Sequence, residues 1–511
     1  MAAVNKIDSN ATGLRYAEET AYKTVGGSEV WTPLEPNSYE DFGGEITTVA
    51  RNPINDSRQR KKGVVTDLDA SGGFNTDLTQ TNLEDILQGF FFADLRRKGE
   101  EVPTAATATT DLFSVASTTG FQVGDLINST GFDDAANNVT AEPITAIVSD
   151  TTIEVLGASL VTDGSPASGV NIVNVGHEAA SADLDVVVSG ALPVIFSNGT
   201  LDFTTLGLLP GEWIYVGGDS ASNQFVNAVN NGFKRIYSIT ATELTLDKSE
   251  STMVVETGTS LEIHLYFGRV LKNEAAASIV RRTYQLERAL GAPDDSSPAQ
   301  IQYEYIEGAV PNEVTFNIPT AEKLTADLSF VGADNSTIDG PTSAKGGTRP
   351  DLVEADAFNT SSDFTRIKLY QYVSGNEAPD ALFAYAQDIT ISFNNNVSPN
   401  KAVGTLGSFE ATAGTFEVGG DITAYFADVD AVTAVRNNVD ITLDIIMVKD
   451  NAGIAIDLPL ITLGNGRLEV AQDEPITLPL SMEAATGAGY LSTMDHTAMM
   501  VFWDYLPTAA G

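Results

Sequence analysis

Short runs in which apolar and polar residues alternate constrain the fold of this chain more than any other feature of its sequence. The clearest are residues 323–330 (KLTADLSF), 388–393 (DITISF) and 440–448 (DITLDIIMV), and segments rich in Gly, Asn, Asp and Ser separate such runs. Successive side chains of a β-strand point to opposite faces, so this alternation predicts strands with one buried face. Long amphipathic helical patterns are absent, and the sequence therefore predicts a mainly β protein built of sandwiches or barrels.

Two short helices are expected among the strands. The first would begin at Thr81, because Thr81 and Glu84 have the spacing of a capping box. Its apolar face would consist of Leu83, Ile86, Leu87 and Phe90. The second would begin near Asp428, a residue type that caps helix N-termini, and end at residues 437–438. Its apolar side would consist of Val429, Val432 and Val435.

The segments that lead into these two helices are similar to each other. Residues 72–81 (GGFNTDLTQT) align without a gap with residues 419–428 (GGDITAYFAD), from a Gly-Gly pair through a strand to the helix cap. We interpret this as two copies of one unit that consists of a sandwich and a flanking helix. The alternative is coincidence in a β protein that is rich in Gly and Thr.

Residues 101–263 differ from the rest in being rich in Ala, Thr, Ser, Asn and Val and poor in Lys and Arg. Residues 120–127 (GFQVGDLI) match residues 207–214 (GLLPGEWI), and each precedes a pair of predicted strands. We expect two small β-barrel modules, residues 101–195 and 196–263, inserted into a loop of the first copy. The first copy would comprise residues 1–100, completed by about 264–290, and the second would comprise residues 275–511.

Two segments carry candidate contact residues. Residues 332–365 are polar and too long for an ordinary connection, so we expect either a surface loop or an arm that docks onto a neighbouring molecule. Residues 51–62 form a basic cluster in an acidic protein, and would either meet an acidic surface of another subunit or remain a solvated loop. The basic residues of the two segments are Arg51, Arg58, Arg60, Lys61, Lys62, Lys345 and Arg349.

The charge balance limits the possible partners. The 511 residues include 69 acidic and 28 basic ones, which gives a formal net charge of −41. Such an excess of acid disfavours wrapping of nucleic acid, which requires Lys and Arg against phosphate. It would suit a wall past which DNA slides without binding. Solubility alone and a salt-rich habitat are the alternative explanations of the charge.

The sequence contains no recognisable catalytic motif. The absence of cysteine excludes disulfides, thiol catalysis and thiolate metal sites. His177, His264 and His496 lie far apart in the sequence, so we interpret them as structural residues rather than metal ligands. Neither a phosphate-binding loop nor a hydrolase elbow is found. We therefore expect no enzymatic activity, no cofactor and no metal.

The N-terminal segment bears on the compartment in which the chain is made. The first 30 residues show no apolar signal segment, and no apolar run approaches the length of a membrane helix. We therefore expect synthesis in a cytoplasm and no membrane partner.

The order of several segments resembles that of the tail tube (major tail) proteins of long-tailed phages. These segments are residues 13–19 (GLRYAEE), 30–34 (VWTPL), 56–59 (DSRQ), 407–426, 439–448, 454–461 (IAIDLPLI) and 476–484 (ITLPLSMEA). The resemblance covers roughly residues 1–100 and 275–490, and none of its motifs is catalytic. The insertion at 101–263 departs from the basic pattern of the family.

The resemblance implies a structural virion protein, made in the host cytoplasm, that self-assembles into stacked rings around a channel for double-stranded DNA. Two fused copies resemble the variant in which three subunits form a ring with pseudo-sixfold symmetry, instead of six subunits. The implied partners are other copies of the chain, a tape-measure protein, tail-end proteins and DNA that passes without specific binding. The basic residues named above and the loop 333–365 would then make ring-to-ring contacts. The alternatives are a non-viral surface or adhesion β protein and a carbohydrate-active β protein.

Overall fold

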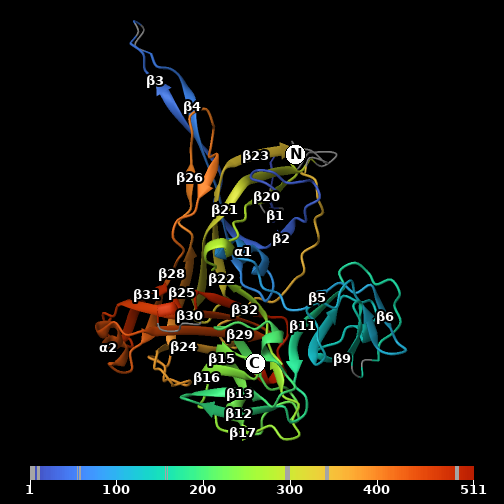
Figure 1. Cartoon of the computed structure of the whole chain (residues 1–511). Helices are drawn as coiled ribbons and strands as arrows, with labels where there is room; N and C mark the ends of the chain where they lie inside the picture. Colours follow the sequence, from blue (N-terminus) through green and yellow to red (C-terminus); the bar gives the residue numbers. More distant parts are fainter. Residues whose placement is uncertain are drawn as a thin grey trace. The chain divides into compact units, whose positions relative to one another are not determined.

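The computed structural model describes residues 6–7, 12–54, 56, 59–155, 157, 159–293, 300–339, 344–489 and 494–511. It consists mainly of antiparallel strands, which confirms the mainly β prediction (Figure 1). The chain divides into two compact units. Unit 1 comprises Met1–Asp94, Glu274–Thr360 and Ala386–Ala424, and unit 2 comprises Leu95–Asn273, Ser361–Tyr385 and Tyr425–Gly511.

Unit 1 is an antiparallel arrangement around the long strand β21. Its elements are β1 (Gly13–Glu18), β2 (Thr32–Leu34), β3 (Pro36–Arg51), β4 (Lys61–Asp77), α1 (Glu84–Phe91), η5 (Ala276–Ser278), β20 (Tyr284–Gly291), β21 (Gln302–Pro319), β22 (Thr325–Gly332), β23 (Asp334–Asp339), β25 (Ala386–Asn394), β26 (Ser398–Asn400), β27 (Glu410–Thr412) and β28 (Glu417–Tyr425). Pairing runs β2–β1–β20–β21, and β21 also pairs with β22, β23 and β25. Strand β22 continues to β4 and β3, whereas β25 continues to β28.

Helix α1 covers the core of unit 1 with the apolar face that the sequence predicts. Leu83, Ile86, Leu87 and Phe90 are all buried. The predicted capping box is wrong, because the helix begins at Glu84 and Leu83 occupies the N-cap without a side-chain hydrogen bond. Asn82 organises the preceding turn instead: its side chain accepts from the backbone N–H of Thr79 and donates to the carbonyl of Asp77.

Unit 2 contains the inserted strands and the strands near the C-terminus. The inserted elements are β5 (Glu100–Glu101), β6 (Ala105–Thr107), β7 (Leu112–Ser114), β8 (Asp125–Thr130), η2 (Ala135–Asn137), β9 (Glu142–Ser149), β10 (Thr152–Val155), β11 (Asn171–Glu178), β12 (Leu184–Ser189), β13 (Leu192–Ser197), η3 (Phe203–Leu206), β14 (Trp213–Val216), η4 (Ala228–Asn230), β15 (Gly232–Ile239), β16 (Glu243–Ser249), β17 (Glu256–Thr257) and β18 (His264–Tyr266). They pair in the order β17–β12–β13–β16–β15–β14–β18–β11–β8–β9–β10–β7–β6. One buried apolar cluster gathers residues 106–172 and another gathers residues 179–267.

The remaining elements of unit 2 form a second antiparallel ladder. They are β19 (Arg269–Lys272), β24 (Phe364–Gln371), α2 (Asp430–Asn437), β29 (Ile441–Lys449), β30 (Ala452–Asn465), β31 (Thr477–Ala485), η6 (Gly487–Gly489), β32 (Met499–Trp503) and η7 (Thr508–Ala510). Strand β29 pairs with β24 and β30, and β30 pairs also with β31 and β32. No described helix is long and apolar enough to cross a membrane.

Helix α2 begins slightly later than the sequence predicts. Val429 is its N-cap, and the carboxylate of Asp428 accepts from the backbone N–H of Asp430. The predicted end at residues 437–438 is confirmed, since Asn438 adopts the left-handed conformation that ends helices. The predicted valine face is wrong: Ala431 and Ala434 are the buried residues, and Val429 remains exposed. These alanines let the helix approach β30 closely.

A buried ionic network joins inserted strands to C-terminal strands within unit 2. Arg235 of β15 is fully buried and donates to Asp247 of β16 at 2.7 Å and to Asp457 of β30 at 3.0 Å. The indole Nε1 of Trp213 donates to Asp457 at 3.0 Å. Arg366 of β24 pairs with Asp444 of β29 nearby. Because a buried ion costs several kcal/mol unless it is paired, these contacts make the inserted strands an integral part of unit 2.

Candidate functional surfaces

One face of the sheet in unit 1 is polar across five neighbouring strands. In β22, Ala326, Leu328 and Phe330 are buried, whereas Asp327 and Ser329 on the opposite face are half-buried. The same alternation continues in β21 and β25. The sheet therefore presents an apolar face to the core and a polar face on its other side.

The strand register arranges the polar side chains in three rows. The central row consists of Asn75, Asp327, Thr315, Ser392 and Gly419, from β4 across β22, β21 and β25 to β28. One flanking row consists of Gly73, Ser329, Glu313, Asn394 and Glu417. The other consists of Asp77, Thr325, Asn317, Thr390 and Asp421. We call these three rows the polar face; none of their residues is Lys or Arg.

Hydrogen bonds between strands hold a negative charge at the centre of the polar face. The Nδ2 of Asn75 donates to one carboxylate oxygen of Asp327 at 2.5 Å, and that of Asn317 donates to the other at 2.6 Å. Both donors are uncharged amides, so the charge of Asp327 is oriented but not cancelled. Lys323 pairs with Asp77 at 2.7 Å at the end of the neighbouring row. The polar face is thus acidic, and the basic residue next to it, Lys323, lies at its edge.

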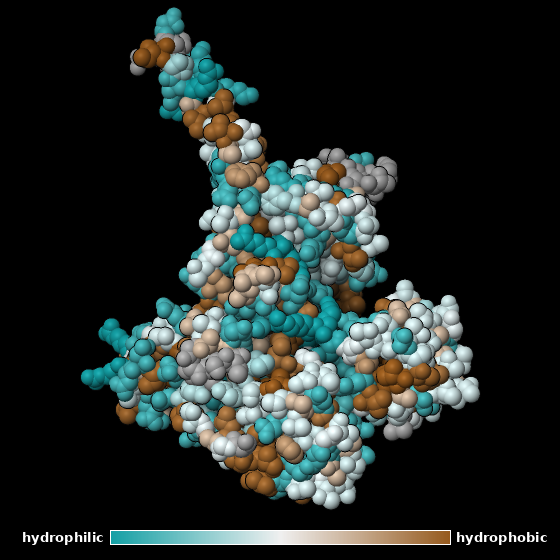
Figure 2. All heavy atoms as spheres, viewed as in Figure 1, coloured by the Kyte–Doolittle hydropathy of each residue, from teal (hydrophilic) through white to brown (hydrophobic). Residues whose placement is uncertain are grey.

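A long hairpin is the second feature of unit 1. Strands β3 and β4 extend beyond the other strands of the unit (Figure 1). Apolar and hydrophilic side chains alternate along the hairpin surface (Figure 2). The exposed apolar residues of its outer part are Ile46, Val49, Ile54, Val64 and Val65. An isolated pair of strands is marginally stable in water, so these exposed side chains mark a surface suited to contact with another molecule.

The basic residues at the end of the hairpin have no ion-pair partner within the described part of the chain. Arg51 pairs in register with Lys61, and Arg60 and Lys62 adjoin them, so four cations lie together. Arg58 lies outside the described residues. Farther down the hairpin the situation differs, because Lys401 bridges Asp67 and Asp69 at 2.5 Å each. The structure therefore brings together four of the five predicted residues, and these four form no ion pair with any described residue.

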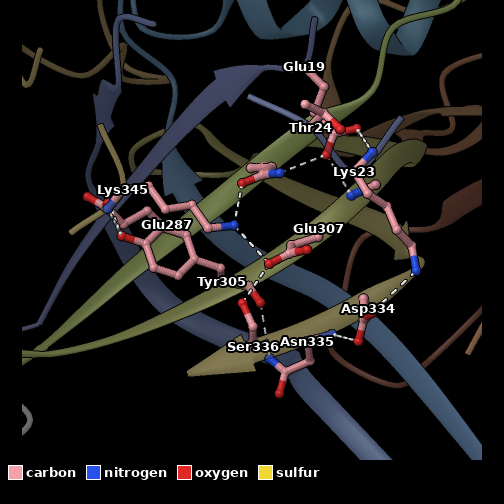
Figure 3. Close-up of polar contacts among 12 residues, drawn as sticks. Glu19, Lys23, Thr24, Glu287, Tyr305, Glu307, Asp334, Asn335, Ser336 and Lys345 are labelled. Carbon is pink, nitrogen blue, oxygen red and sulfur yellow. Dashed lines mark hydrogen bonds and ion pairs between the residues drawn. The ribbon is translucent and has the colours of Figure 1, made fainter. Parts of the chain in front are cut away.

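Lys345 and Arg349, by contrast, are engaged with their own chain, and Figure 3 shows the contacts of Lys345. The Nζ of Lys345 lies 2.8 Å from a carboxylate oxygen of Glu307 and 2.7 Å from the side-chain oxygen of Gln285. Arg349 pairs with Glu287 through two hydrogen bonds and lies over the ring of Trp31. The structure thus fastens this part of the polar segment 332–365 onto β20 and β21.

The electrostatics of this contact strengthen it. Partial burial pushes the pKa of Glu307 upward, but hydrogen bonds from Lys345 and Ser336 outweigh this and hold that pKa below its ordinary value. The hydrogen bond to Glu287 raises the pKa of Arg349. Trp31 adds a hydrogen bond from its Nε1 to the carbonyl of Gly346 at 2.9 Å. The segment around Lys345 is therefore anchored by charge and by aromatic packing.

The three histidines all lie in unit 2, whereas the surfaces described above belong to unit 1. His177 bonds Asp125, His264 bonds Glu178, and His496 is buried. Among the described residues, no group of three or more His, Asp or Glu side chains could hold a metal ion.

Sequence reasoning identified the basic cluster but missed the polar face. The signal was present in the alternating runs 323–330 and 388–393, whose polar positions within the strands are Asp, Ser and Thr. Their alignment into rows depends on strand register, which pairs residues far apart in the chain.

Comparison with known proteins identifies the family. The family model described as phage tail tube protein matches residues 9–484. No curated protein matches the chain.

Proposed function

The chain belongs to the phage tail tube protein family, and we propose that its copies assemble into stacked rings that form a conduit for double-stranded DNA. Membership makes it a structural component of the virion tail. The observation that carries the conduit proposal is the acidic polar face, which lacks Lys and Arg throughout its three rows. No catalytic step and no cofactor form part of the proposal.

In the proposed tube, the polar face lines the lumen. Each Lys or Arg that contacts a phosphate adds to the affinity of a protein for DNA. A wall of carboxylates, amides and hydroxyls offers no such contact, and its negative charge repels phosphate at short range. Asp327, held in place by Asn75 and Asn317, would keep this repulsion at the centre of the face. DNA would therefore pass without binding.

The order of elements supports a duplicated unit and rings of three subunits. The hairpin β3–β4 precedes α1, after which β20, β21 and β22 pair consecutively. The hairpin β25–β28 precedes α2, after which β29, β30 and β31 pair consecutively in the same way. The flanking strands also correspond, since β1 pairs with β20 and β24 pairs with β29. Three chains with two such copies each would give pseudo-sixfold rings.

The hairpin β3–β4 would make the ring-to-ring contact. Its outer part, residues 44–51, spans about 26 Å at the usual rise per residue of a strand, which is a long reach for an assembly contact. The four cations at its end would meet an acidic surface of the next ring, in a chain with a net charge of −41. We keep residues 333–365 as a second proposed contact. Lys345 and Arg349 would position it through their ion pairs within the chain.

The partners that we propose are other copies of the chain, a tape-measure protein in the growing tube, tail-end proteins and passing DNA. Synthesis would take place in the host cytoplasm. Residues 101–195 and 196–263 stay proposed as the inserted modules. By the proposed duplication, β21 and β22 belong to the first copy, whereas the boundaries predicted from the sequence assign them to the second copy, residues 275–511.

Electron microscopy of the purified protein tests the assembly. We expect hollow tubes whose rings show threefold symmetry with a pseudo-sixfold outline. Dispersed monomers at high concentration, even with a tape-measure fragment added, would contradict the proposal.

DNA binding to assembled tubes tests the lumen assignment. Thr315→Lys combined with Ser392→Lys places two cations in the central row, and we expect such tubes to retain short double-stranded DNA that wild-type tubes release. Thr145→Lys with Thr200→Lys, at exposed positions of the inserted region, adds the same charge elsewhere and serves as the control. Equal DNA retention by the two double variants would refute the assignment of the polar face to the lumen.

A further inference from the structure

A cleft of about 540 Å³ lies among the inserted strands of unit 2, and the tube function gives it no role. Its lining consists of Gln122, Val123, Gly124, Pro143, Ile144, Thr145, His177, Glu178, Ala179, Ala180, Thr200, Leu201, Asp202, Thr205 and Glu262. The lining contains neither Lys nor Arg, and neither Phe, Tyr nor Trp. It offers an apolar floor and polar groups that mostly accept hydrogen bonds.

His177 is the most deeply buried polar side chain of the cleft, with 5% of its surface exposed. Its Nδ1 lies 2.9 Å from a carboxylate oxygen of Asp125, which is also buried. The other oxygen of Asp125 accepts from the side chain of Asn174 at 2.8 Å and from the backbone N–H of Gln122 at 3.0 Å. A carboxylate that only accepts requires Nδ1 to carry the proton. In the neutral imidazole, the Nε2 of His177 is then an acceptor.

The Nε2 of His177 has no hydrogen-bond partner within the described part of the chain, and the ring edge that carries it packs against Gly124, where a larger residue would collide with the imidazole. A Cβ added to Gly124 would lie 3.0 Å from Nε2 and 2.8 Å from Cε1 of the imidazole. Gly124 has φ +92, a conformation that glycine adopts readily. A buried imidazole that lines a cleft and has one nitrogen without a partner can accept a hydrogen bond from a ligand.

The charges around the cleft specify the kind of donor. Glu178, Asp202 and Glu262 line it, and no basic side chain does. Glu178 is engaged with His264 at 2.8 Å, and Asp202 accepts from the backbone of Thr204 at 2.9 Å. The carboxylate of Glu262 has no partner within the described residues and is exposed at the rim. The cleft therefore favours a donor that carries positive charge.

We propose that this cleft binds a small molecule with a protonated primary amine, which donates a hydrogen bond to Nε2 of His177 and whose charge is balanced by Glu262 and Glu178. Amino sugars and aliphatic polyamines share this chemistry. The amine donates hydrogen bonds to the imidazole and the carboxylates of the lining, and the carbon skeleton packs on Ile144 and Leu201. This site is independent of tube assembly.

Calorimetric titration of the unassembled full-length chain tests the proposal. The probes are glucosamine and spermidine, with N-acetylglucosamine as the neutral analogue of glucosamine. We expect saturable binding of at least one amine and none of the acetylated sugar. Binding of glucosamine alone would identify an amino sugar, and binding of spermidine alone would identify a polyamine.

Two matched variants separate the cleft from general attraction of cations to an acidic protein. Glu262→Gln removes one carboxylate at the rim, and we expect the affinity for the bound amine to fall about three- to fivefold. Asp133→Asn removes one exposed carboxylate of the inserted strands outside the cleft and should leave the affinity unchanged. His177→Gln should abolish binding. If His177→Gln does not fold, the comparison of Glu262→Gln with Asp133→Asn still tests the proposal. Equal effects of Glu262→Gln and Asp133→Asn, binding of N-acetylglucosamine as tight as that of glucosamine, or no saturable binding at tens of millimolar amine would overturn the proposal.

Discussion

Replacing Arg235 with methionine tests whether the buried ionic network holds unit 2 together. Arg235 is fully buried, and its partners Asp247 and Asp457 have side chains that are 3% and 1% exposed. The substitution keeps much of the side-chain volume but leaves two carboxylates in the interior without their cation. Removing one partner of a buried ion pair costs about 3–5 kcal/mol, because the remaining charge is uncompensated.

The loss should appear as a shift in the unfolding transition of unit 2. For a unit of this size, each kcal/mol lowers Tm by roughly 2–4 °C, so we expect a decrease of roughly 6–20 °C. Thermal unfolding followed by tryptophan fluorescence reports this unit, because Trp213 donates directly to Asp457. The control is Arg97→Met, which breaks a pair with Glu100 whose side chains are 37% and 27% exposed. That variant should lose no more than about 1 kcal/mol.

The pH dependence provides an independent check of the same reasoning. Burial raises the pKa of Asp457 to about 6, against the attraction of Arg235, so the carboxylate is ionised at neutral pH. Removing Arg235 raises the pKa of Asp457 further, so the folded variant binds a proton that the unfolded chain does not. The stability deficit of Arg235→Met should therefore be larger at pH 8 than at pH 5.5. A deficit as small as that of Arg97→Met, and independent of pH, would refute the idea that stranded carboxylates set the cost.

Three further changes test other parts of the structure. His496 is buried with no hydrogen-bond partner among the described residues, and burial lowers its pKa to about 3. Between pH 6.5 and 3 the unfolded chain therefore binds a proton at this residue that the folded chain does not. The free energy of unfolding then falls by about 1.4 kcal/mol for each pH unit of acidification. His496→Phe should flatten that slope in urea unfolding at pH 7 and pH 5, and an unchanged slope would refute the assignment. Lys61→Glu combined with Lys62→Glu should leave Tm unchanged but shorten the tubes seen by electron microscopy. Arg467→Glu, at an exposed position elsewhere, should not shorten them. Tubes of normal length from the double variant would exclude the hairpin as the contact. Deleting residues 101–263 removes both donors to Asp457, Trp213 and Arg235, so the deletion variant should yield little soluble protein. Adding Asp457→Asn to the deletion variant should raise that yield. Equal yields with and without Asp457→Asn would count against the network.

The alternation of apolar and polar residues predicted individual strands well. Residues 323–330, 388–393 and 440–448 coincide largely with β22, β25 and β29. The third run nevertheless does not have an exposed face, since residues 441–448 are all buried. The polar residue Asp444 is accommodated there by Arg366, which lies 78 positions earlier. A local pattern marks a polar side chain but does not reveal whether its partner is water or a distant cation.

Helix starts were harder to predict because several residue types compete for the same role. Thr81 and Glu84 satisfy the spacing of a capping box, yet Asn82 organises the turn by bonding the backbone of Asp77 and Thr79, which both precede it. Near α2, the Asp428 carboxylate does bond the first turn, but the helix buries alanines rather than valines. The outcome depends on which side chain fits against the neighbouring strand, and that is decided by packing.

The positions of the few Lys and Arg residues, and the ion pairs that they form, connect the fold with the proposed function. The chain has 28 Lys and Arg residues against 69 Asp and Glu residues, so cations are the limiting partner in its ion pairs. Several are used inside the units, as with Arg235 and Arg366 in unit 2 and Lys345 and Arg349 in unit 1. The basic end of the hairpin differs from these, because it gathers four exposed cations that have no ion-pair partner within the described part of the chain. In the proposed tube, the basic hairpin end would bind acidic copies of the chain, and a polar face without Lys or Arg would give DNA phosphate no cation to bind.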